Sequence, residues 1–219
     1  MSAAAPLLAA RDLSLPLGDG EVLRGLSFDL HPGELLQLVG PVEAASAALR
    51  ALLGLQRPAG GSVRLLGEDP HALSRCAAAR LLARVGWLPR EGALLANLTL
   101  RENLLLPLRF HHGDQADPAA PGRALGRLGL DHAPDVRPER AALPLRRRIS
   151  LARALLLEPA LVLADGPLHD LDDDAAAIIT GALRAYAREP GRAVLVASPY
   201  PDLASALSAR LVHLEVAST

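Results

Sequence analysis

The stretch Leu35–Leu55 has the order in which phosphate chemistry is built: an apolar strand, a break at Gly40 and Pro41, a short loop and an apolar helix. Such a loop binds phosphates when its residues supply three things. Glycines let successive backbone N–H groups turn inward, a lysine reaches the β- and γ-phosphates, and a serine or threonine holds Mg²⁺. The layout alone therefore predicts a nucleotide-binding site, and the side chains determine whether a nucleotide can bind there.

The side chains of this loop do not meet those conditions. After Gly40 and Pro41 come Val42–Ala45, then Ser46 at the lysine position and Ala47 and Ala48 at the hydroxyl positions. All 23 residues in the Lys+Arg count are arginine, so no shift of the alignment recovers a lysine. We interpret the stretch as a nucleotide-binding fold that has lost its nucleotide site.

Composition limits what else the chain can be. Its 219 residues, half of them hydrophobic, can bury one substantial core, which predicts a single domain over 1–219. A formal charge of −1 gives no electrostatic case for nucleic acid as a partner. The single cysteine, Cys76, excludes an internal disulfide and suits a reducing compartment. Residues 1–15 show neither a signal peptide nor a transmembrane helix.

Apolar runs and turn residues predict the elements that position this loop. Strands alternate with helices, which favours an α/β fold with a largely parallel sheet. The expected strands are 7–15, 21–30, 34–39, 62–66, 85–88, 160–165 and 193–197, and the expected helices include 46–55, 146–157 and 172–189. Thr99 and Glu102 have the spacing of a capping box ahead of a leucine-rich helix that Pro107 should end or kink, and 111–122 is the best loop candidate.

Taken together, these features resemble the ATP-binding subunit of an ABC transporter over nearly the whole chain. The resemblance rests on five runs: 33–41, 57–67, 91–108, 151–165 and 168–172. It implies a P-loop NTPase-like nucleotide-binding domain with a parallel-sheet core, an antiparallel β-subdomain and a small helical subdomain at about 92–150. The run 91–108 looks most like subunits of bacterial lipid-trafficking systems of the mammalian-cell-entry type.

The positions that carry function in that family are mostly changed here. Among the expected remnants of the nucleotide site are Gly40 and Ser46, and only Asp165, at the Walker B carboxylate, and Asp172, in the D-loop, match the family's residues. The changed positions are Leu15 for the adenine-stacking ring, Arg90 for the glutamine that senses Mg²⁺, Ala141–Leu145 for the signature loop, Gly166 for the catalytic glutamate and Pro199 for the switch histidine.

These losses predict a catalytically inactive subunit. Charge-assisted hydrogen bonds contribute ~1.5–3 kcal/mol each, so losing the lysine and Mg²⁺ contacts removes ~3–6 kcal/mol of nucleotide binding. Glycine at position 166 leaves no general base, which lowers the rate by a further ~10²–10⁴. We therefore expect a pseudo-ATPase that is not an enzyme and holds no cofactor and no metal.

The resemblance also implies partners and a location. In this family the segment after the glutamine position docks on a membrane permease, which here points to Arg90, Glu91, Leu94, Leu95, Asn97 and Leu98. The expected role is to scaffold or regulate a membrane transporter, in particular one that moves lipid, from the cytoplasmic face of the bacterial inner membrane. A second ATPase subunit, or a second copy of this chain, is the other expected partner.

Two other functions stay open at this stage. The chain could be an ATP-binding transporter subunit with an unconventional nucleotide site, in which Arg90 or Arg50 replaces the lysine, or a soluble inhibitor that captures a competent ATPase subunit. We interpret Asp165 as a structural carboxylate, Asp172 as a helix cap and Arg146–Arg148 as a solvated first turn of a helix.

Overall fold

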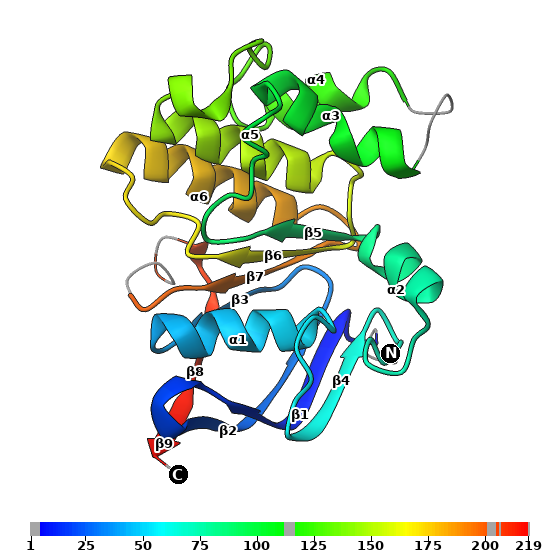
Figure 1. The fold of residues 1–219 in the computed structure, drawn as a ribbon, viewed down its shortest axis with the longest axis vertical. Coiled ribbons are helices and arrows are strands. Elements are labelled where there is room, and N and C mark those ends of the chain that lie inside the picture. The colour runs from blue at the N-terminus through cyan, green and yellow to red at the C-terminus, as the bar shows by residue number, and fades with distance from the viewer. Residues whose placement is uncertain (1–4, 112–116, 201–204, 206, 219) are drawn as a thin grey trace.

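The computed structural model describes residues 5–111, 117–200, 205 and 207–218. Helix α1 (Val42–Leu52) lies between two sheets, and the longer helices of the second half of the chain cover the far face of the second sheet (Figure 1). The chain ends near the first sheet, so segments far apart in sequence meet there. This layering confirms the predicted α/β fold with an antiparallel part, a parallel core and a helical part.

The two sheets differ in direction. The antiparallel sheet has the order β4-β1-β2-β9, with β1 Leu8–Pro16, β2 Glu21–Leu30, β4 Gly60–Leu65 and β9 Glu215–Ser218. The parallel sheet has the order β5-β6-β7-β3-β8, with β3 Leu35–Val39, β5 Val85–Leu88, β6 Leu161–Asp165, β7 Ala193–Ala197 and β8 Arg210–His213. Because all strands of the second sheet run the same way, their carboxyl ends gather at one edge.

Alternating side chains divide the parallel sheet between two cores. On β6, Leu161 and Leu163 join α1 and the antiparallel sheet in one core, whereas Val162 and Ala164 join the helices of the far face in the other. All five residues in each of β3, β6 and β7 are buried, as expected of strands covered on both faces. The remaining helices are α2 Arg75–Leu82, α3 Leu100–His111, α4 Ala120–Gly126, α5 Leu143–Leu155 and α6 Asp173–Ala187.

Several boundaries differ from the sequence expectation. α1 begins at Val42 rather than Ser46 and α5 at Leu143 rather than Arg146, since both start without a side-chain cap that would mark them. α3 continues through Pro107 instead of ending there. The expected loop 111–122 includes the start of α4, and its residues 112–116 lie outside the described part of the chain. In the described ranges, no helix is both long and apolar enough to cross a membrane.

Candidate functional site

Helix α1 begins directly after a two-residue turn at the carboxyl end of β3. Pro41 precedes the helix, and no side chain caps it. The amides of Val42, Glu43 and Ala44 therefore have no partner within the helix, and none to another residue is seen in the described part of the chain. A helix N-terminus of this kind carries partial positive charge and can receive an anion.

Gly40 allows this turn to pack closely against Leu214. The amide of Leu214 donates to the carbonyl of Val39 at 2.8 Å. A Cβ on Gly40 would lie only 2.8 Å from the Cβ of Leu214, closer than two carbons can pack. The glycine predicted as a remnant of a phosphate loop is therefore required by packing.

Glu43 places a carboxylate beside the same helix N-terminus. Its Oε1 accepts a hydrogen bond from the amide of Gly18 at 3.1 Å, which links α1 to the short 3-10 turn η1 (Gly18–Gly20). A carboxylate in the first turn interacts favourably with the helix dipole. It also repels a phosphate at the same place, so an anion here must approach against that charge.

Asp165, Ser46 and Arg90 come together at the carboxyl ends of β6 and β5. The Ser46 hydroxyl donates to Asp165 Oδ2 at 2.5 Å, and Arg90 Nη1 lies 3.6 Å from Asp165 Oδ1. Asp165 is 4% exposed, and Oδ1 accepts no hydrogen bond from any described residue. The structure thus brings together two predicted remnants of the nucleotide site and one predicted docking residue.

The absence of a side chain at Gly166 makes room for Arg90. A Cβ built on Gly166 would lie 2.7 Å from Arg90 Nη1, and Gly166 has a φ of +51°. Arg90 and Gly166 also line a cleft of about 1000 Å³, whose other walls include Asp170, Thr180 and Tyr200. The guanidinium therefore stands between the buried carboxylate and this cleft.

Asp172 has a separate, local role. Its carboxylate accepts a hydrogen bond from the amide of Ala175 at 2.8 Å and so forms the N-cap of α6. Asp173 and Asp174 follow in the first turn, where negative charge is favourable. The side chain makes no contact with Ser46 or Asp165 in the hydrogen bonds and ion pairs of the described residues.

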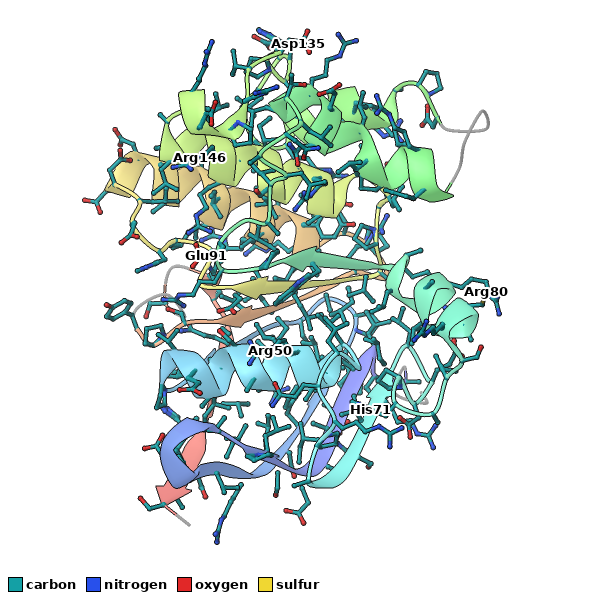
Figure 2. The ribbon with its side chains drawn as sticks, in the orientation of Figure 1. Arg50, His71, Arg80, Glu91, Asp135 and Arg146 are labelled. Atoms are coloured by element: carbon teal, nitrogen blue, oxygen red, sulfur yellow. The ribbon has the colours of Figure 1, made fainter. Side chains whose placement is uncertain are left out.

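The predicted docking residues split into two groups. Arg90 turns inward to Asp165, while Glu91, Leu95 and Asn97 are exposed and Leu94 and Leu98 are half-buried. Figure 2 shows Glu91 at the end of the sheet, below the part of α5 that carries Arg146. The exposed group lies on the irregular segment 89–99 between β5 and α3.

Side chains of α5 hold the start of that segment by its carbonyl groups. Arg147 donates to the carbonyl of Arg90, Ser150 Oγ to that of Gly92 at 2.9 Å, and Arg153 to those of Gly92 and Ala93 at 2.9 Å each. Burial lowers the pKa of both the Arg147 and the Arg153 guanidinium.

The expectation that the arginine run is a solvated turn is therefore wrong for Arg147, which is 6% exposed. The carbonyls of an irregular segment need donors, and this side chain supplies one. Sequence reasoning missed the arrangement, although the spacing of Arg147, Ser150 and Arg153, three residues apart on a helix, was its signal.

The fold implies a nucleotide with Mg²⁺, and the residues fit the two parts unequally. The free amides of α1 fit an anion. The metal fits poorly, because both Asp165 oxygens already face partners, one a hydroxyl and the other a cation. Within the described residues, no three His, Cys, Asp or Glu side chains cluster as a metal site.

Comparisons with known proteins agree with the fold. A family model described as ABC transporter matches residues 23–169. The lipoprotein-releasing system ATP-binding protein LolD 2 of Caulobacter vibrioides is 34% identical over 206 residues, covering 91% of this chain and 90% of that protein. LolD of Pseudomonas fluorescens is 34% identical over 218 residues, covering 95% of each.

Solved structures show the same architecture. The dimeric ATP-binding cassette MJ0796, in a post-hydrolysis state with ADP and Pi, superposes with a TM-score of 0.83 at 21% identity, covering 95% of this chain and 94% of that one. The cassette cbiO1 of Clostridium perfringens gives 0.79 at 18% identity, covering 97% and 86%. At these identities the likeness concerns the fold.

These relatives correct the functional prediction. A catalytically inactive scaffold that is not an enzyme was expected, but proteins matching nearly the whole chain are named as ATP-binding proteins of a transport system. The prediction of a pseudo-ATPase is therefore wrong. It weighed only the side chains missing from a motif, whereas the amides of α1 and the guanidinium of Arg90 remain at this edge of the sheet. Because the family model spans most of the sequence and relatives at 34% identity cover more than nine-tenths of it, the chain belongs to the ABC transporter family, as an ATP-binding domain.

Proposed function

We propose that this chain is the ATP-binding subunit of a bacterial transporter of the lipoprotein-releasing kind. The observation that carries the proposal is the 34% identity to LolD 2 of Caulobacter vibrioides over 206 residues. The lipoprotein-releasing system ATP-binding protein LolD of Geobacter metallireducens is also 34% identical, over 91% of this chain. Within the predicted class of lipid transport, these names favour lipoprotein release over the mammalian-cell-entry type.

The subunit would work at the cytoplasmic face of the inner membrane, held there by a transmembrane permease. The surface proposed for the permease is the exposed part of the segment 89–99: Glu91, Leu95 and Asn97, with Leu94 and Leu98 at its base. Leu95 is 48% exposed although it is apolar, which suits a side chain that a partner covers. A second cassette, identical or different, would complete the pair, as in the dimeric cassette MJ0796.

Docking is tested by placing a charge on this surface. Leu95→Asp should abolish co-purification with the permease, because burying an unpaired carboxylate in an interface is costly. Leu55→Asp is the matched control, since Leu55 is 59% exposed, follows the C-terminal end of α1 outside the segment 89–99, and should leave association unchanged. Retained association in Leu95→Asp, or equal loss in both variants, would count against the proposed surface.

Nucleotide binding is tested by thermal unfolding of the purified chain. ATP at about 100 times its Kd should add ~2.7 kcal/mol of stability. For a chain of this length that raises Tm by about 5–10 °C. LolD 2 of Caulobacter vibrioides, prepared in the same way, is the control. An unchanged Tm for this chain at millimolar ATP, beside a shifted control, would remove ATP binding from the proposal.

A further inference from the structure

The carboxylate of Asp165 already has a cation. It is almost fully buried, its Oδ2 accepts the Ser46 hydroxyl, and its Oδ1 faces Arg90 Nη1 at 3.6 Å. No hydrogen bond reaches Oδ1 from the described residues, so electrostatic attraction to the guanidinium is its main compensation. A divalent cation at Oδ1 would have to sit beside this positive charge or displace it.

The position of the guanidinium is built by its neighbours. The backbone of Arg90 is fixed where its carbonyl accepts from Arg147 on α5. Its Nη1 occupies the space over Gly166, where a Cβ would come within 2.7 Å. The side chain is 19% exposed, so it is held between the core and the cleft. The side chain of Arg90 therefore occupies space that is open because residue 166 is a glycine, so the two residues are compatible in size.

A guanidinium offers a phosphate the positive charge that a metal ion would offer, together with N–H groups that point in fixed directions. It is always charged and presents five donors in a planar fork that suits phosphate. Arg90 directs Nη1 toward Asp165 and is also one of the residues that line the cleft. Ser46, the side chain nearest to the carboxylate from α1, donates its hydroxyl proton to Asp165 and so keeps that oxygen occupied.

From these contacts we infer that the Arg90 guanidinium takes the place of the divalent cation beside Asp165, so that this chain binds nucleotide without Mg²⁺. The inference rests on the proposed ATP-binding function and deepens it. It assigns Arg90 to the nucleotide site and not to the docking surface.

The experiment measures ATP binding to the purified full chain by calorimetry, in EDTA and in Mg²⁺. The wild type should show a Kd that differs by less than about twofold between the two conditions. Arg90→Gln should weaken binding in EDTA by about tenfold or more, the value of one charge-assisted hydrogen bond, and Mg²⁺ should restore part of the loss. Arg101→Gln is the matched control, because the exposed guanidinium of Arg101 on α3 pairs with Asp135 at 3.5 Å, and Asp135 lies far from the loop that carries Glu91 (Figure 2).

A second variant guards against misfolding of the first. Gly166→Ala should push the guanidinium away through the new Cβ and shift Mg²⁺ dependence in the same direction as Arg90→Gln. A wild type that binds at least about tenfold more tightly with Mg²⁺ than with EDTA overturns the inference. So does an affinity of Arg90→Gln in EDTA equal to that of the wild type.

A metal-only measurement separates this inference from the proposed function. If the wild type binds no ATP in either condition, the ATP-binding function fails, and Mn²⁺ titration followed by electron paramagnetic resonance decides the question of the cation. Arg90→Gln should then bind Mn²⁺ about tenfold more tightly than the wild type, and adding Asp165→Asn should abolish the gain. Equal Mn²⁺ affinity in the wild type and Arg90→Gln overturns the inference.

Discussion

Two connections leave the same edge of the parallel sheet and are stabilised in opposite ways. The turn between β3 and α1 has two residues, Gly40 and Pro41, and is fixed by packing against Leu214. The segment 89–99 between β5 and α3 has no regular structure and is fixed by side chains that bind its backbone. The turn leaves backbone amides at the start of α1 unpaired, whereas the carbonyls of the segment 89–99 accept hydrogen bonds from side chains.

The difference separates binding from docking. Unpaired amides at the start of α1 can receive a ligand that comes and goes. Carbonyls held by Arg153, Ser150 and Asn103 instead fix the shape of a surface that is irregular in itself. An irregular segment of this length needs such donors, because its own backbone cannot pair. One edge of the sheet thus combines a place for an anion with a preorganised surface for a partner.

Asn103 gives the largest expected effect on this contrast. It is fully buried on α3, accepts from the Leu95 amide at 2.7 Å, and donates to the carbonyls of Leu95, Leu98 and Thr99. Asn103→Ala would leave several of these groups unpaired, which should lower the free energy of unfolding by about 3–4 kcal/mol. Urea unfolding measures the loss.

The control lies on the segment itself. Asn97 is exposed, and Asn97→Ala should change stability by no more than about 0.5 kcal/mol. A loss below about 1 kcal/mol in Asn103→Ala would mean that the segment does not depend on side-chain donors. The proposed difference between the two connections, one fixed by packing and the other by side-chain donors, would then be wrong.

Gly40 tests the other connection. Gly40→Ala would force its Cβ to 2.8 Å from the Cβ of Leu214, and relieving that overlap should cost about 1–3 kcal/mol. Gly60→Ala is the control, since a Cβ there would meet no atom within 4 Å. Chemical denaturation of both variants measures the difference, and an unaffected Gly40→Ala would show that packing does not fix this turn.

The sequence predicted the scaffold better than the site, for a physical reason. Buried strands such as β6 and β7 are continuous apolar runs, and this local pattern is visible without a structure. β8 and β9 were missed because they are short and largely exposed, and their pairing with β3 and β2 depends on distant parts of the chain.

At the site, the meeting of Ser46 and Asp165 follows from the order of strands, because both stand at carboxyl ends in the parallel sheet. The inward turn of Arg90 was only one of the placements that the sequence left open. It depends on the room left at Gly166 and on the bond from Arg147, and these residues are brought together only by the fold. The sequence assigned Arg90 to the docking surface and, in the alternative hypothesis, to the place of the lysine in the nucleotide site.

Glu102 gives the smallest expected effect and the only one that depends on pH. It forms the predicted capping box: its carboxylate accepts from the Thr99 amide at 2.8 Å, and its own amide donates to the Thr99 hydroxyl at 3.1 Å. The bond from the Thr99 backbone, followed by that from its side chain, lowers the pKa of Glu102 in the folded chain. The stabilisation is therefore complete above the pKa of the unfolded chain and disappears as the pH falls through the folded value.

Glu102→Gln should accordingly be slightly less stable than the wild type near neutral pH and equal to it in acid, below the folded pKa. Unfolding of both proteins at a series of pH values measures the difference. Thr99→Ala is the companion variant, because it removes the cap itself and should cost about 1 kcal/mol. If the gap between the wild type and Glu102→Gln persisted in acid, the charge of Glu102 would not be its source, and the end of the segment 89–99 would be held by the neutral hydrogen bonds of Thr99 and Asn103 alone.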